Sequence, residues 1–142
     1  MKRVLLLISL LFLLPLVSAS YDGAFNLDKS FVQLGDTFTI SGGNIQFDGA
    51  KYNGNAMIII SGNNESYTLL TLINEGEFSY IASFCDLQEC VLDKASGEFK
   101  VTVKLLNLQL ESLHEFENVL TLNVVDKLDI ILILIENTLN NK

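Results

Sequence analysis

Apolar and polar residues alternate in short runs along most of the chain. The run 98–105 is the clearest, because Phe, Val, Val and Leu alternate with Glu, Lys, Thr and Lys. The runs 37–41 and 77–84 follow the same pattern. A period of two is typical of a strand with one buried and one exposed face, so we predict a strand in each run. The side chains expected to face inward are Phe38, Ile40, Phe78, Tyr80, Ala82, Phe84, Phe99, Val101, Val103 and Leu105.

Shorter apolar runs and turn residues complete the pattern. We expect further strands at 25–27, 31–34, 56–60, 67–73 and 120–124. Residues typical of turns separate the runs at 34–36, 41–43, 53–55, 62–64, 74–76 and 96–97. The stretch 106–116 fits a continued strand and hairpin or a helical turn near 111–115, and we favour the hairpin. An all-β fold follows, an antiparallel β-sandwich of about seven to nine strands rather than a parallel α/β fold.

The first 19 residues have a different composition from the rest. Lys2 and Arg3 form a short basic head, the stretch 4–17 is mostly apolar, and Val17-Ser18-Ala19 supplies small residues at the positions that a signal peptidase reads. We predict a signal peptide at 1–19, and a mature chain that is secreted or lies on the cell surface without membrane insertion. The alternative is an uncleaved membrane anchor. The apolar stretch 4–17 is shorter than the roughly 20 residues that span a membrane, which disfavours this alternative.

The net charge of the chain excludes some classes of binding partner. Nine Lys and Arg stand against 17 Asp and Glu, a net charge of -8. Without Lys2 and Arg3, seven basic residues remain, and the mature charge is -10. Binding of nucleic acid or anionic lipid depends on a basic surface, so we expect neither. The expected partner is a protein or glycan at the cell surface, with self-association as a further option.

Two cysteines and one sequon fit an exported chain. Cys85 and Cys90 lie five positions apart, and in an oxidising compartment we expect them to form a disulfide that closes a small loop. A zinc site would need two further ligands, and His114 is the only histidine. Asn64 begins the sequence Asn-Glu-Ser, which makes it a candidate for N-glycosylation.

Few residues offer catalytic or cofactor chemistry. The sequence has no Gly-x-Ser-x-Gly elbow, so we interpret His114 as a surface residue and predict no enzyme. No cofactor or metal is predicted. An alternative is a calcium ion held by loop oxygens, although Asp and Asn in turns usually bind their own backbone. The calcium candidates are Asp22, Asp28, Asp36, Asp48, Asn53 and Asn55, and the candidate exposed contacts are Tyr21, Tyr52 and Tyr67.

Three segments resemble a known family. LGDTFTISG at 34–42, GEFSY at 76–80 and GEFKVTV at 97–103 are similar to strands of the immunoglobulin-like modules found in secreted bacterial and archaeal surface proteins. The resemblance covers roughly 21–125 and implies an immunoglobulin-like sandwich at 20–126 that serves cell-surface architecture, adhesion or the spacing of other domains. The chain lacks the core Trp of antibody-type domains, and its Cys pair is too close in sequence for their inter-sheet bridge.

The C-terminal segment 127–142 contains an unusual run. In LDIILILI at 128–135, both faces of a strand would be apolar. It is interpreted as a covered strand of the same sandwich, as the start of a further module, or as a strand added to the sheet edge of a partner. Weak membrane association is a further alternative, for which the run is short. The positions that a strand exchange would use are Leu128, Ile130, Leu132 and Leu134.

We therefore expect a non-catalytic extracellular or cell-surface module with a structural or adhesive binding role. The alternative is a subunit of an extracellular assembly, joined by donation of the strand 128–135.

Overall fold

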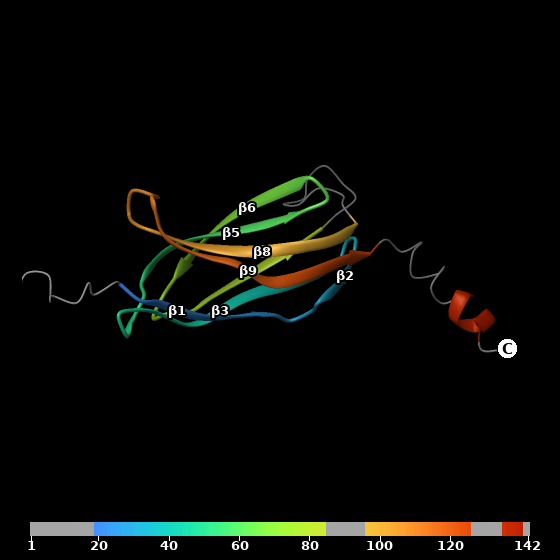
Figure 1. Cartoon of the computed structure of the whole chain (residues 1–142), viewed down its shortest axis with the longest axis horizontal. Helices are drawn as coiled ribbons and strands as arrows, with labels where there is room; N and C mark the ends of the chain where they lie inside the picture. The colour runs from blue at the N-terminus through green and yellow to red at the C-terminus, as the bar shows by residue number, and fades with distance from the viewer. Residues whose placement is uncertain (1–18, 85–95, 126–134, 141–142) are drawn as a thin grey trace, which may run out of the picture.

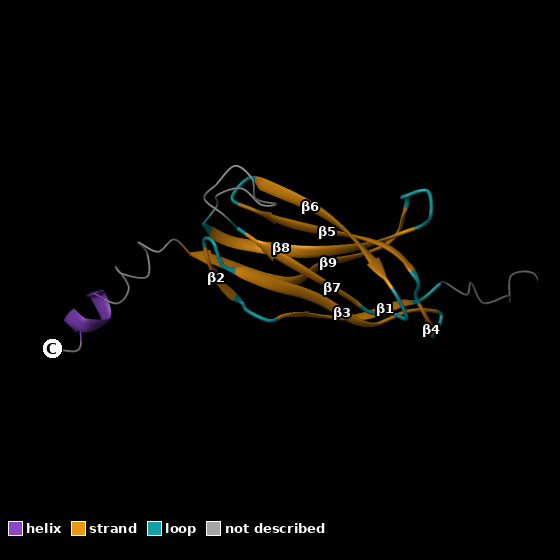
Figure 2. Cartoon of the chain, turned by 180° about the vertical axis from the view of Figure 1, so that it is seen from behind, coloured by secondary structure: helices purple, strands orange, loops and turns teal. Residues whose placement is uncertain are grey.

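Two β-sheets pack face to face in the computed structural model of the chain, which describes residues 19–84, 96–125 and 135–140 (Figure 1). Residues 135–140 form a short helix, the purple segment in Figure 2. The prediction of an all-β sandwich is confirmed. The strands are β1 (Tyr21–Leu27), β2 (Phe31–Gln33), β3 (Thr37–Phe47), β4 (Ala50–Lys51), β5 (Gly54–Gly62), β6 (Glu65–Ile73), β7 (Phe78–Ser83), β8 (Gly97–Leu106) and β9 (Ser112–Val125).

Each sheet has a long central strand. In the β3 sheet, β3 lies between β1 on one side and β7 and the short β4 on the other, and all pairs are antiparallel. The β8 sheet has the order β2-β9-β8-β5-β6. Its pairs are antiparallel except β2 with β9, where Phe31 lies opposite Asn123 in a parallel register. The second strand and the last strand of the sandwich therefore pair in one sheet.

The inner faces of both sheets carry the side chains that the period of two assigns to the core. Phe38, Phe84 and Phe99 are fully buried; the rings of Phe38 and Phe84 stack, and the ring of Phe99 is tilted against that of Phe84. The ring centroids of Phe38 and Phe84 are 5.7 Å apart, and those of Phe84 and Phe99 are 5.0 Å apart. All ten predicted inward positions are buried, except Tyr80, which is half-buried. The predicted core is confirmed.

One predicted turn is wrong. The pair Gly42-Gly43 was expected to end a strand, but β3 runs through it to Phe47. Gly42 lies opposite Phe78, whose ring covers it so closely that a Cβ at residue 42 would be 2.3 Å from the Phe78 ring. Residue 42 is therefore a glycine because any side chain there would overlap the Phe78 ring. The chain turns only at Asp48-Gly49, where both residues have positive φ.

The undecided stretch 106–116 is a hairpin, as favoured. β8 ends at Leu106 and β9 begins at Ser112. The face of β8 that the alternation assigns to solvent is partly buried, since Thr102 on this face is buried. The Thr102 hydroxyl accepts a hydrogen bond from the backbone N–H of Asn118 in β9 at 3.1 Å.

Several predictions concern residues outside the described part. These are most of the signal peptide, the pair Cys85 and Cys90, and the exchange positions Leu128, Ile130, Leu132 and Leu134. Within the described part, the helix 135–140 begins at Ile135, the last residue of the predicted C-terminal strand. No helix among the described residues has the length and apolar character needed to cross a membrane.

The two adjacent glycines of β3 give a matched test of the core. Gly42→Ala should lower the free energy of unfolding by about 1–3 kcal/mol, because its methyl group displaces the buried Phe78 ring. Gly43→Ala should change it by no more than about 0.5 kcal/mol, since no atom lies within 4 Å of its added Cβ. Urea unfolding of both variants measures the difference, and equal midpoints would contradict the packing described for Gly42.

Candidate functional site

The loop between β8 and β9, residues 107–111, displays leucines to solvent. Leu108 is 87% exposed and Leu110 is 56% exposed. Figures 1 and 2 show this loop standing clear of the other ribbons at one end of the sandwich. Single exposed apolar residues are common, but two on one short loop form a concentrated apolar tip.

Asn107 holds this loop in one conformation. Its side-chain oxygen accepts hydrogen bonds from the backbone N–H groups of Gln109, at 2.9 Å, and Glu111, at 2.8 Å. Its side-chain amide donates to the Glu111 carboxylate at 2.9 Å, and its backbone N–H donates to the Glu111 carbonyl at 2.9 Å. Asn107 thus donates two hydrogen bonds and its side-chain oxygen accepts two more, and these bonds hold the loop in a preformed conformation.

Leu110 adopts an uncommon backbone conformation. Its φ is +62°, in the left-handed region that bulky side chains rarely occupy. Its N–H donates to the carbonyl of Asn107 at 3.0 Å, which holds it there. Local strain of this kind persists only where the surrounding bonds over-determine it, and it concentrates at functional positions.

A second apolar feature lies on β6. Leu70 is 55% exposed and Leu72 is 72% exposed, both on the outer face of the β8 sheet. A hollow of about 440 Å³ lies beside them, lined by Asn55, Leu70, Thr71 and Leu72. Asn55 pairs with Leu72 on one side and with Leu106, the last residue of β8, on the other. The β6 leucines and the base of the β8–β9 loop therefore lie at the same end of this sheet.

Aromatic rings join the two sheets at that end. Tyr21 of β1 stacks on Phe47 at a centroid distance of 4.8 Å and on His114 of β9 at 4.7 Å. The edge of His114 meets Phe116 at 4.6 Å. His114 is half-buried between rings, so the expectation of a simple surface histidine is wrong. Its role here is to pack the end of β9 against β1.

Tyr52 connects the same end through hydrogen bonds. Its N–H donates to Ile45 of β3 at 2.9 Å, and its carbonyl accepts from the N–H of Gly76 at 2.9 Å. Its hydroxyl donates to the carbonyl of Leu106 in β8 at 2.7 Å. Burial raises the pKa of the Tyr52 phenol above its usual value, and nearby Tyr21 raises it further. The three predicted exposed tyrosines, Tyr21, Tyr52 and Tyr67, are all half-buried.

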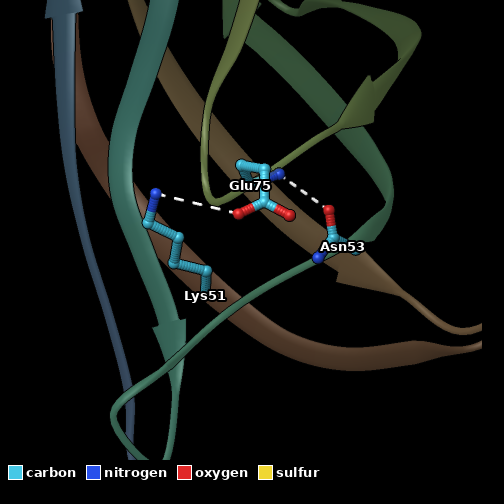
Figure 3. A network of polar contacts seen from close by, with 3 residues as sticks. All are labelled: Lys51, Asn53 and Glu75. Atoms are coloured by element: carbon cyan, nitrogen blue, oxygen red, sulfur yellow. Dashed lines mark hydrogen bonds and ion pairs between the residues drawn. The ribbon is translucent and has the colours of Figure 1, made fainter.

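A small polar network fixes the turn at the end of β6 (Figure 3). The side-chain oxygen of Asn53 accepts from the backbone N–H of Glu75 at 2.7 Å. Lys51 lies 3.8 Å from the Glu75 carboxylate, and because both side chains are exposed this ion pair adds little stability. Glu75 has a positive φ, so these contacts and the Gly76–Tyr52 bond hold a tight turn in place.

The predicted calcium candidates do not come together. Asp28 accepts from the backbone N–H of Thr39 at 2.7 Å, near the start of β3, while Asp48 accepts from the N–H of Ser20 at 2.8 Å, beyond its end. These positions lie roughly 30 Å apart along an extended strand. In the described part of the chain, no group of three or more His, Cys, Asp or Glu side chains is placed to hold a metal ion. Asp28, Asp48 and Asn53 instead accept hydrogen bonds from backbone N–H groups of other segments of the chain.

The glycosylation candidate Asn64 lies in an exposed turn. Gly62 pairs with Glu65, and the two residues between them, Asn63 and Asn64, have φ values of 49° and 63°. This is the two-residue hairpin turn that asparagine favours. Asn64 is at the opposite end of β6 from Leu72, so a glycan there would leave the β6 leucines uncovered.

Sequence reasoning missed both exposed leucine features. Residues 106–113 carry leucines at the same spacing as buried strand positions, and the alternation alone cannot show that the hairpin tip falls among them. The signal that was present is the flanking pair Asn107 and Glu111, since asparagine commonly closes turns through its side chain.

Comparison with known proteins adds no relative to this description. Neither a protein-family model nor a curated protein matches the chain. The resemblance at 34–42, 76–80 and 97–103 stays a prediction, and the function has to be argued from the surfaces described above.

The closure of the β8–β9 loop is open to test by amide exchange. Asn107→Ala removes the acceptor for the N–H groups of Gln109 and Glu111, so the hydrogen exchange of each should accelerate about fivefold, which corresponds to about 1 kcal/mol for each bond lost. Gln109→Ala is the control, because only the backbone of Gln109 takes part. Equal exchange in the two variants would contradict the role given to Asn107.

The Tyr52 hydroxyl should contribute to stability. Tyr52→Phe should lower the free energy of unfolding at neutral pH by about 1 kcal/mol, because the Leu106 carbonyl loses its donor. Tyr80→Phe is the control, since its hydroxyl has no hydrogen bond to a described residue.

The stability difference between the wild type and Tyr52→Phe should depend on pH. The pKa of Tyr52 is raised in the folded state above its ordinary value of 10.0, so its contribution is complete below that pH and is lost as the pH rises through the folded-state pKa. The difference between the wild type and Tyr52→Phe in urea unfolding should therefore shrink above pH 10. A constant difference across this range would contradict it.

Proposed function

We propose that the mature chain is a non-catalytic extracellular or cell-surface module that binds a protein partner through the β8–β9 loop. The observation that carries this proposal is the preformed loop with Leu108 and Leu110 exposed at its tip. A loop that is already ordered loses little conformational entropy on binding, so more of the contact energy appears as affinity. Covering two exposed leucines supplies apolar area for that contact.

The order of the strands supports an immunoglobulin-like module. β1, β3 and β7 occupy the places of strands A, B and E, while β9, β8 and β5 occupy those of G, F and C. β6 then corresponds to the additional C′ strand of variable-type domains. The four-residue turn 74–77 between β6 and β7 takes the place of a strand D. In this scheme the β8–β9 loop is the F–G loop at one end of the sandwich.

An extracellular location is supported by three features of the sequence. The segment 1–19 has the arrangement of a signal peptide, and Cys85 and Cys90 have a spacing that suits a disulfide in an oxidising compartment. Asn64 offers a glycan acceptor in an exposed turn. A sandwich placed outside the cell would present its acidic surface there.

A binding role rather than catalysis agrees with the surroundings of His114. Its imidazole stacks on the ring of Tyr21 in the other sheet and contacts the ring of Phe116 on its own strand, and both are packing contacts.

The chemistry of the loop indicates the kind of partner. Leucine side chains suit an apolar pocket on a protein better than a glycan, which usually stacks on aromatic rings. Glu111 and the overall negative charge around the module favour basic residues at the rim of that pocket. We therefore expect a protein with an apolar pocket and a basic rim.

Binding to cells of the source organism tests this proposal. Beads coated with the mature chain should be retained on intact cells, and the double variant Leu108→Ser/Leu110→Asn should weaken retention at least about tenfold, because burial of leucine contributes about 1.5–3 kcal/mol. Asparagine tolerates the left-handed backbone at residue 110, so the variant should unfold at the same temperature as the wild type or higher.

Ile81→Ser is the matched control, since Ile81 is 69% exposed but lies on β7, in the other sheet. Its retention should equal that of the wild type. Undiminished retention of the double variant would refute binding through the loop.

A further inference from the structure

The edge of β6 offers a second surface, and we infer that two copies of the chain pair there, β6 against β6, in an antiparallel and two-fold symmetric arrangement. The two β8 sheets would then join into one continuous sheet. This inference goes beyond the proposed function, because it uses β6 rather than the β8–β9 loop.

The outer edge of β6 has unused pairing capacity among the described strands. β6 pairs with β5 on one side, and no other described strand pairs with it. Gly62 and Glu65 flank the two-residue turn and form a hydrogen-bonded pair, after which pairs alternate along the ladder. The backbone N–H and C=O groups of Ser66, Thr68, Leu70 and Leu72 are therefore directed to the open edge.

This edge lacks the features that normally prevent pairing. Exposed edge strands usually carry a charge, a proline or a bulge. β6 has no charged residue or proline between Glu65 and Glu75, and its nine residues pair with β5 without a register shift. Instead, the edge displays Leu70 and Leu72 beside the hollow of about 440 Å³.

The sequence of β6 is complementary to itself around Thr71. With the two-fold axis at that residue, Leu70 lies opposite the partner's Leu72 on the outer face. On the inner face, Leu69 lies opposite the partner's Ile73. Leu70 and Leu72 both direct their backbone groups to the edge, so in this register they form hydrogen-bonded pairs. The exposed leucines of each copy then pack beside those of the other on the outer face of the joined sheet.

Competing registers match less well. An axis at Leu69 would place Leu70 opposite the partner's Thr68 and leave the leucines without apolar partners across the strand. A two-fold pairing of identical edges is closed, so it stops at two copies. Each copy carries a net charge of -8, or -10 without the first 19 residues, and this repulsion weakens at high salt.

Sedimentation of the mature chain tests the pairing. The wild type should form dimers, with a dissociation constant that falls when salt is raised from low to physiological strength. Leu70→Lys/Leu72→Lys should raise that constant at least hundredfold, because both strands then place lysines at the edge. Ile81→Lys is the matched control on the other sheet and should leave it unchanged.

Cross-linking tests the register. In the pairing around Thr71, the two copies of residue 71 form a non-hydrogen-bonded pair with Cα atoms about 4.5 Å apart, within the range of a disulfide. Thr71→Cys should therefore give a covalent dimer under mild oxidation, with the 71–71 link identified by mass spectrometry. Thr68→Cys should not, since the two copies of residue 68 lie far apart.

Three results would overturn the inference. They are a wild type that stays monomeric at every salt concentration, a dimer that persists in Leu70→Lys/Leu72→Lys, and a dimer lost in Ile130→Lys/Leu132→Lys but not in the β6 variant. The last would assign the assembly to the segment 128–135. The proposed loop function is tested separately, because Leu108→Ser/Leu110→Asn should still dimerise and Leu70→Lys/Leu72→Lys should still be retained on cells.

Discussion

Phe84 packs between the two sheets, against Phe38 of β3 and Phe99 of β8, with all three rings buried. These contacts join β8 of one sheet to the paired strands β3 and β7 of the other. A shift of one residue in any of these strands would turn its buried rings out to water. Because the inner faces are fully occupied, every feature that could meet a partner lies on an outer face, an edge or a loop.

The alternation along the chain was enough to predict the sandwich and nearly all of its core, since burial on one face imposes a period of two directly on the sequence. It failed at Gly42, which local preference assigns to a turn. Gly42 lies instead in β3, opposite Phe78, which is 36 positions further along the chain. It failed at His114 for a related reason, because the Tyr21 ring that stacks on it comes from β1 in the other sheet. Such contacts depend on which strands become neighbours, and that information is absent from any single run of residues.

The two apolar surfaces at one end of the β8 sheet differ in how they would bind. In the β8–β9 loop, Asn107 already accepts hydrogen bonds from the backbone, so the loop would bind through its side chains. Its specificity would depend on the shape of the pocket on the partner. The edge of β6 presents backbone groups as well as Leu70 and Leu72, so its specificity lies in register. Tyr52 and the turn after β6 hold both surfaces in a fixed relation, because Tyr52 bonds to Leu106 at the base of the loop and to Gly76 beyond the end of β6.

The parallel pairing of β2 with β9 also bears on how the chain folds as it is made. Synthesis proceeds from the N-terminus, and β2 has to wait for a strand about 90 residues later before its hydrogen bonds can form. β9 also pairs with β8, the central strand of the β8 sheet. Because β9 is the last strand to be made, we expect the sandwich to close late and cooperatively. The only proline of the sequence is Pro15, so no proline isomerisation slows folding of the sandwich itself. The rate of folding is then set by the search for distant strand partners, and the unpaired strands stay exposed to other chains until β9 arrives.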